Sequence, residues 1–164
     1  MHSLVALAGY LRRNGLLVVT AESCTAGLIA ARLADEPGCG SLLDSAFVVY
    51  SPGAKQRELG LTRELLATHN LTSEPVARAM AEGALARVPE ATLAISNTGV
   101  ADDGGEGVEP GTQCFGWSFR RRGAVVSFTE TARFGGDRAA LRARAAEFAL
   151  LRVFRYHALA WRAG

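Results

Sequence analysis

The chain has few of the residues that build metal sites and disulfide frameworks. Its three cysteines, Cys24, Cys39 and Cys114, are an odd set without a CxxC pair, and its three histidines are scattered. Zinc sites draw on closely spaced cysteine and histidine ligands, so we expect no metal site. Unpaired cysteines favour a reducing compartment, and we therefore expect a cytoplasmic protein.

Long apolar runs and a strong charge of one sign are also lacking. No stretch is apolar enough to span a bilayer, and residues 1–5 show no basic segment before an apolar one, so we expect neither a membrane span nor a secretory signal. The net charge of +2 argues against a nucleic-acid binder. The length of 164 residues fits a single domain, residues 1–164, with a sizeable core.

Lysine is the scarcest charged residue. Lysine and arginine together number 18, and Lys55 is the one lysine among them. A desolvated lysine can lose its proton and act as a base, which arginine in effect cannot do. Lys55 is therefore a candidate for a chemical role.

The stretch Thr20-Ala21-Glu22-Ser23-Cys24-Thr25-Ala26-Gly27 joins an apolar run at 16–19 to a small-residue helix predicted at 28–34. A strand that turns into a helix places its turn at the carboxyl edge of a sheet, where open α/β folds bind ligands. The free N–H groups of the helix start could hold an oxyanion, with Ser23 or Cys24 beside them as nucleophile. The alternative is that Ser23 or Thr25 only caps the helix.

The remaining pattern predicts a three-layer α/β/α sandwich with a mixed, mostly parallel sheet of about five strands. Helical crossovers make the first three strands parallel, and the last two form a hairpin. We expect strands at 16–19, 46–50, 91–97, 114–119 and 124–131, and helices at 4–14, 28–34, 54–59 and 63–68, after Ser73, and from Asp137 to near the end.

Two arginine-bearing segments receive different interpretations. Arg120, Arg121 and Arg122 are expected in a solvated hairpin turn, and a single long helix is expected after its cap, Asp137. Arg138 falls in the first turn of that helix, where the helix dipole disfavours a cation. Such local conflicts concentrate at functional sites, so Arg138 is a candidate site residue.

The segment 98–112 is a long, glycine-rich and acidic loop. It has neither the GxGxxG spacing of a dinucleotide site nor the lysine of a P-loop. Its length predicts either a functional loop or a flexible surface loop.

Four element ends carry polar residues that could meet in one cleft. Ser23 follows the first strand, Tyr50 and Lys55 follow the second, Thr98 ends the third, and Arg138 opens the last helix. The chain has no GxSxG elbow, no SxxK motif and no Ser-His-Asp set. A neutral Lys55 could still deprotonate Ser23 for attack on an amide or ester, the Ser-Lys variant of serine catalysis.

Taken together, these motifs resemble the C-terminal-domain family of CinA proteins. The resemblance covers nearly the whole chain. It is carried in order by 20–27, by Val49-Tyr50-Ser51-Pro52-Gly53-Ala54-Lys55, by Leu59-Gly60-Leu61, by His69 with Ser73-Glu74-Pro75-Val76-Ala77, by Thr98-Gly99-Val100-Ala101, and by Phe134-Gly135-Gly136-Asp137-Arg138. The chain looks like a stand-alone member of the family.

The resemblance implies an amidohydrolase that converts nicotinamide mononucleotide and water into nicotinic acid mononucleotide and ammonia. It implies no metal or other cofactor, a bacterial cytoplasmic setting and a homodimer. The family's nucleophile falls on Ser23, its lysine on Lys55 and its tyrosine on Tyr50. Substrate-binding positions fall on Thr25, Thr98, Gly99 and Arg138.

The chain departs from the family pattern at three places. Ala26 replaces a glycine, and the loop after Gly99 is shortened and becomes acidic with Asp102 and Asp103. A lysine of the family is also lost in the segment 108–112. If that loop lines the pocket, it brings two acids to where a phosphate would lie. An amidase for a less anionic amide, a non-catalytic ligand-binding module, and Cys24 as the nucleophile therefore remain alternatives.

Overall fold

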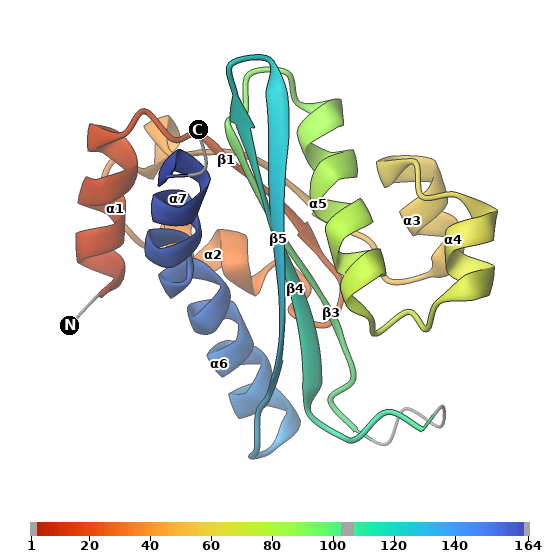
Figure 1. Ribbon diagram of the computed structural model, residues 1–164. Coiled ribbons are helices and arrows are strands. Elements are labelled where there is room, and N and C mark those ends of the chain that lie inside the picture. Colours follow the sequence, from red (N-terminus) through yellow and green to blue (C-terminus); the bar gives the residue numbers. More distant parts are fainter. Residues whose placement is uncertain (1–2, 103–106, 163–164) are drawn as a thin grey trace.

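The computed structural model describes residues 3–102 and 107–162. Five strands form one sheet in the order β2-β1-β3-β4-β5, with helices on both of its faces (Figure 1). The strands are β1 (Val18–Glu22), β2 (Leu43–Val48), β3 (Leu93–Gly99), β4 (Thr112–Arg121) and β5 (Ala124–Arg133). The predicted three-layer sandwich with a mixed sheet is confirmed.

The helices fall into two groups. Those at the ends of the chain cover one face of the sheet, and those in the middle of the chain cover the other (Figure 1). The first group is α1 (Leu4–Arg13), α2 (Leu28–Ala34), α6 (Arg138–Leu151) and α7 (Val153–Arg162); the second is α3 (Pro52–Leu59), α4 (Arg63–Thr68) and α5 (Glu74–Arg87); a short 3-10 turn spans Cys39–Ser41.

Alternation along the strands divides the core in two. Phe115, Trp117 and Phe119 of β4 point to the face under α6 and α7, where the indole N–H of Trp117 donates to the Ala149 carbonyl at 2.9 Å. The opposite face packs Val19 and Ala21 of β1 against the small-residue side of α5. Because side chains alternate along a strand, one sheet serves both cores.

The pairing of the strands decides where functional residues gather. β1 pairs in parallel with both β2 and β3, whereas β3–β4 and β4–β5 are antiparallel. The carboxyl ends of β1, β2 and β3 therefore lie along one edge of the sheet. The chain leaves β1 towards β2 through α2 on one face and reaches β3 through α5 on the other, which makes this edge the usual ligand position of an α/β sheet.

The first strand lies further along the chain than its apolar run predicts. It covers Val18–Glu22 rather than 16–19, so Thr20 and Glu22 are strand residues. Flanked by strands on both sides, β1 is buried throughout, and the Thr20 hydroxyl donates to the Glu22 carboxylate at 2.9 Å. Pairing with a strand on each side and a satisfied carboxylate outweigh the weak strand propensity of Glu22.

The hairpin is present as predicted, but two of the three arginines expected in its turn, Arg120 and Arg121, lie in β4. The turn is only Arg122-Gly123, both with positive φ, as a two-residue hairpin turn requires. Arg120 belongs to β4 and donates to the Leu85 carbonyl at 2.7 Å, and Arg121 donates to the Ala160 carbonyl at 2.8 Å. These two arginines tie helix ends to the sheet instead of forming a solvated turn.

The predicted single C-terminal helix is two helices. α6 ends at Leu151 and α7 begins at Val153. The intervening Arg152 forms a two-pronged ion pair with Glu130 of β5, both contacts at 3.0 Å, and Tyr156 donates to the same carboxylate. The Glu130 carboxylate thus fastens the break between the helices to the edge of the sheet.

A buried glutamate organises the β1–α2 connection. The Glu22 carboxylate accepts hydrogen bonds from the hydroxyls of Thr20 and Thr25 and from the backbone N–H groups of Gly27, Ile29 and Ala30. Glu22 therefore satisfies the start of α2, and neither Ser23 nor Thr25 caps it. A carboxylate at this position also suits the positive end of the helix dipole.

Substitution of Ala26 by glycine tests the strain in this connection. Ala26 has a φ of 47°, a left-handed conformation that costs an L-residue about 1–2 kcal/mol. The greater entropy of unfolded glycine offsets part of this cost. Ala26→Gly should therefore raise the free energy of unfolding by about 0.5–1 kcal/mol in urea titrations. The control Ala31→Gly, at an exposed position inside α2, should lower the free energy of unfolding by about 1 kcal/mol. Equal losses in both variants would contradict the backbone strain assigned to Ala26.

Substitution of Glu22 by glutamine tests the buried cap. Glutamine keeps the shape of the side chain but presents an N–H₂ group to donors that need an acceptor. We expect Glu22→Gln to lower the free energy of unfolding by about 3 kcal/mol, measured by urea denaturation, because buried donors are left without a partner. The exposed Glu90→Gln should change it by less than about 0.5 kcal/mol. Similar small effects in the two variants would show that Glu22 does not hold the turn.

Candidate active site

Lys55 and Ser23 meet at the carboxyl edge of the sheet. Lys55 lies on α3, whose start is capped by the Ser51 hydroxyl and followed by Pro52 at the first helical position. Its side chain points inward and is only 1% exposed, and its Nζ lies 3.2 Å from the Ser23 Oγ. The structure thus joins the predicted nucleophile to the predicted base.

The surroundings of Lys55 favour its neutral form. Nζ donates to the backbone carbonyls of Val49 and Tyr50, both at 2.9 Å, and among the residues described no carboxylate pairs with it. Burial lowers the pKa of Lys55 to about 8. A neutral amine can give its two N–H bonds to these carbonyls, which leaves its lone pair for the Ser23 hydroxyl. This is the arrangement that a general base requires.

Tyr50 takes part in the site through two different groups. Its backbone carbonyl orients Lys55, and its side chain, 54% exposed, lines the cleft above Ser23. The predicted link between Tyr50 and Lys55 therefore runs through the main chain. The phenol ring remains available to contact a ligand.

A buried amide network holds the Ser23 turn from the opposite side. The Asn97 carbonyl accepts the Ser23 N–H at 3.0 Å, and the Asn97 Oδ1 accepts the Thr25 N–H at 3.0 Å. Asn97 Nδ2 donates to Gln113, and Arg142 of α6 donates to the carbonyls of Cys24 and Thr25. The turn is therefore fixed by groups on β3, β4 and α6.

Sequence reasoning missed Glu22, Asn97, Gln113 and Arg142 as supports of the site. Glu22 lies within the motif, but its place in the sequence alone does not indicate a supporting role. The signal that could have found Asn97 and Gln113 is an amide side chain at the end of one expected strand and another just before the next, since each needs a partner if it is buried. Nothing local marks Arg142 among the other arginines of its helix.

The backbone donors of the turn are distributed differently from the prediction. The N–H groups at the start of α2 are occupied by Glu22, so they are not free to hold an oxyanion. Within the stretch from Ser23 to Ala30, the Cys24 N–H is the one for which no acceptor occurs among the described residues. The Cys24 side chain contacts the amide of Gln113 at 3.5 Å, and among the described residues no base is hydrogen-bonded to it.

Ser23 lies between two chambers of one cleft, and Ser23, Tyr50, Gly99 and Val100 line both. The first chamber, of about 220 Å³, adds Lys55 and Thr98 together with the 70–72 loop and Val108. The second, of about 210 Å³, adds Cys24, Ala101, Asp102 and Arg138. A Cβ at Gly99 would collide with the buried Gln113 side chain, so a larger residue there would disturb the amide network behind the turn.

Two predicted substrate-binding threonines occupy different positions. The Thr98 hydroxyl donates to the Leu71 carbonyl at 2.8 Å and so holds the loop that walls the first chamber. Thr25 is fully buried, faces Glu22 and lines neither chamber. Thr98 thus borders the cleft, whereas Thr25 lies behind the turn and supports it through Glu22.

Arg138 reaches the second chamber from the start of α6, as predicted. Its guanidinium pairs with Asp102 at 2.6 Å across the chamber mouth. The Tyr50 hydroxyl and the Asp102 carboxylate both raise the pKa of Arg138. Of the two acids predicted to enter the pocket, Asp102 lies there; Asp103 lies outside the described residues.

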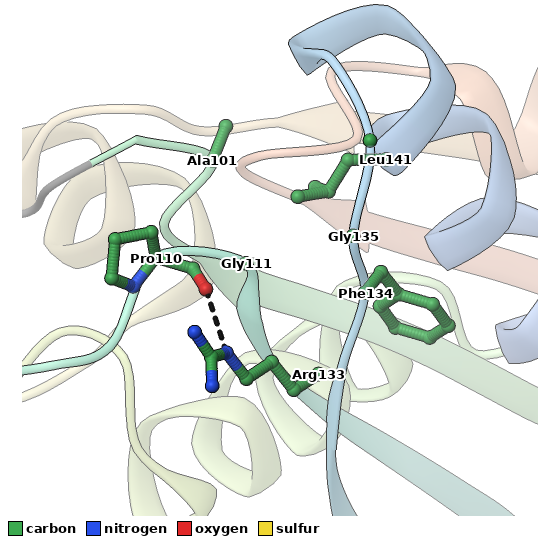
Figure 2. Close-up of a pocket in the computed structure, with 8 residues that line it drawn as sticks. Ala101, Pro110, Gly111, Arg133, Phe134, Gly135 and Leu141 are labelled. Carbon is green, nitrogen blue, oxygen red and sulfur yellow. Dashed lines mark hydrogen bonds between the residues drawn. The ribbon is translucent and has the colours of Figure 1, made fainter.

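A separate hollow of about 380 Å³ adjoins the second chamber at Ala101 and extends under Gly135 and Phe134 (Figure 2). The described residues that line it include no nucleophile and no base. Arg133, the charged side chain among them, is held by the Pro110 carbonyl at 2.9 Å and by Glu109 at 2.6 Å. The chemistry of the chain is therefore concentrated around Ser23.

Other kinds of site find little support in residues 3–102 and 107–162. These residues include no group of three histidine, cysteine, aspartate or glutamate side chains placed to hold a metal ion. The helices formed by the same residues are also too short or too polar to cross a membrane.

Comparison with known proteins places the chain in one family. The profile of the CinA C-terminal domain matches residues 3–157. A CinA-like protein of Chlorobium phaeobacteroides is 43% identical over 157 residues, and one of Mycobacterium avium is 44% identical over 139 residues. These alignments cover 93% and 83% of this chain but 37% and 32% of the relatives, so the chain spans about a third of their length.

Solved structures agree over the whole domain. The competence damage-inducible protein A of Klebsiella pneumoniae superposes with a TM-score of 0.85 at 32% identity, covering 96% of this chain and 98% of that one. The competence/damage inducible protein of Agrobacterium tumefaciens gives 0.81 at 33% identity, covering 94% and 96%. The chain belongs to the CinA C-terminal domain family.

Proposed function

We propose that the protein is a serine amidohydrolase that releases ammonia from the carboxamide of a pyridine nucleotide, with nicotinamide mononucleotide as the substrate to test. The observation that supports this most is the buried contact of 3.2 Å between the Lys55 Nζ and the Ser23 Oγ. Family membership and the resemblance of the motifs supply the substrate class; the names of the relatives do not state an activity.

In the acylation half of the proposed reaction, neutral Lys55 takes the Ser23 proton while Oγ attacks the carboxamide carbon. The resulting ammonium of Lys55 then gives that proton to the departing nitrogen, and ammonia leaves an acyl ester on Ser23. In the second half, Lys55 takes a proton from water, hydroxide attacks the ester, and the proton returns to Ser23. One amide and one water thus give a carboxylic acid and ammonia, which leave as carboxylate and ammonium once the acid's proton passes to the ammonia.

The tetrahedral intermediates carry a negative oxygen that needs donors. We assign this role to the Cys24 N–H, which follows the nucleophile directly and lacks another acceptor within the described part of the chain. Loss of one such donor typically costs about 3 kcal/mol of barrier. The Glu22 cap supports this arrangement because it fixes the turn without using the Cys24 N–H.

The two chambers suggest how a substrate lies. The planar pyridine ring that carries the carboxamide fits the chamber between Lys55 and Thr98, and the Tyr50 ring can stack on it. The remainder of the molecule then extends past Tyr50 toward Arg138. We also propose, from the family resemblance, a homodimer in the cytoplasm.

Ammonia release from nicotinamide mononucleotide tests the Ser-Lys pair. We expect activity in the wild type and a loss of at least about 1000-fold in Ser23→Ala and in Lys55→Met, because removal of a nucleophile or its base has effects of that order. Lys55→Arg should be equally inactive, since it keeps the charge but cannot act as a base. Circular dichroism should show that the variants are folded.

The matched control for the nucleophile is the neighbouring thiol. Cys24→Ala preserves the backbone N–H and should retain activity within about tenfold, because no base in the described part of the chain is hydrogen-bonded to the Cys24 thiol. Activity lost in Cys24→Ala but kept in Ser23→Ala would assign the chemistry to the thiol. A wild type inactive on this amide would remove the mononucleotide from the proposal.

The pH dependence follows from the lowered pKa of Lys55. Burial disfavours the ammonium, and only the neutral amine can accept the Ser23 proton. The value of kcat/KM should therefore rise about tenfold per pH unit below the pKa of about 8 and level off above it. A flat profile between pH 6 and about 9, measured as ammonia release, would contradict a neutral-lysine base.

A further inference from the structure

The ion pair between Asp102 and Arg138 stands at the mouth of the second chamber, beside Ser23. Their side chains are 73% and 51% exposed, and their closest atoms are 2.6 Å apart. Arg138 is the one cation and Asp102 the one carboxylate that line this chamber among the described residues. The described residues that line this chamber therefore carry no net charge, although they include an arginine.

This neutrality matters for an anionic ligand. A phosphate approaching Arg138 meets the Asp102 carboxylate already on the guanidinium, and two anions cannot share its donors without mutual repulsion. Asp102 pairs with Nη1, so a phosphate on the remaining donors of Arg138 either lies beside the carboxylate and is repelled by it or exchanges with it. A ligand without a negative charge faces no such exchange.

We infer that Asp102 determines the charge preference of this cleft, because it occupies Arg138 and so disfavours phosphorylated amides relative to phosphate-free amides of the same ring. The inference rests on the proposed function for the choice of ring. It assigns to Asp102 a role in substrate selection that Arg138 alone would not give. Phosphorylated substrates then bind more weakly than they would if Arg138 were not paired with Asp102.

The structure supplies a matched control for this charge. Glu109 pairs with Arg133 at the same distance of 2.6 Å and with a similar exposure, yet it lines neither chamber of the cleft. Glu109→Gln therefore removes the same charge from the same kind of ion pair without freeing Arg138. Both pairs are exposed, so neither substitution should affect folding.

The experiment measures binding in the Ser23→Ala background, where substrate is not consumed. Calorimetry with nicotinamide mononucleotide and with its phosphate-free nucleoside gives two dissociation constants for each variant. Asp102→Asn should tighten mononucleotide binding about fivefold, the scale expected for one exposed charge, and should leave nucleoside binding unchanged. The gain should shrink at 0.5 M salt, because exposed charges are screened.

Three comparisons decide the inference. Glu109→Gln should leave both constants unchanged, and adding Arg138→Gln should cancel the gain of Asp102→Asn. The inference is overturned if Asp102→Asn fails to tighten mononucleotide binding, if Glu109→Gln has the same effect, or if no variant binds either ligand. The proposed function fails separately: altered binding without ammonia release in the Ser23-containing protein refutes the hydrolase and leaves the role of Asp102 intact.

Discussion

The site depends on a buried lysine that no carboxylate in residues 3–102 and 107–162 pairs with. Lys55 is held by two backbone carbonyls and the Ser23 hydroxyl, and burial lowers its pKa to about 8. An arginine in this position could not lose its proton, and a carboxylate partner would keep the lysine protonated. The fold brings Lys55 to Ser23 because β1 and β2 end side by side and α3, which carries Lys55, begins soon after β2.

The Ser23 turn is kept rigid by polar groups that do not face the cleft. Glu22 holds the start of α2 from one side, and Asn97 and Arg142 hold the turn from β3 and α6. These contacts occupy most of the backbone donors of the turn and leave the Cys24 N–H for the reaction. A carboxylate buried for this purpose is favourable only because every group around it donates to it.

Strand periodicity, helix caps and the single lysine were sufficient to predict the layers, the parallel first half of the sheet and the meeting of Ser23 with Lys55. They were insufficient where tertiary contacts outweigh local pattern. Thr20 and Glu22 became strand residues because neighbours on both sides paired with them, and Arg120 became a tether because a carbonyl of α5 lay within reach. The supports Asn97, Gln113 and Arg142 act across the sheet, which spacing along the chain does not reveal.

The most direct test of the central claim is intact-protein mass spectrometry after treatment with a serine-directed acylating reagent, followed by peptide mapping. If Lys55 activates Ser23, a single acyl group should appear on Ser23 in the wild type and be absent from Lys55→Met under the same conditions. Labelling that survives in Lys55→Met at an equal rate, or that falls on Cys24, would contradict the account.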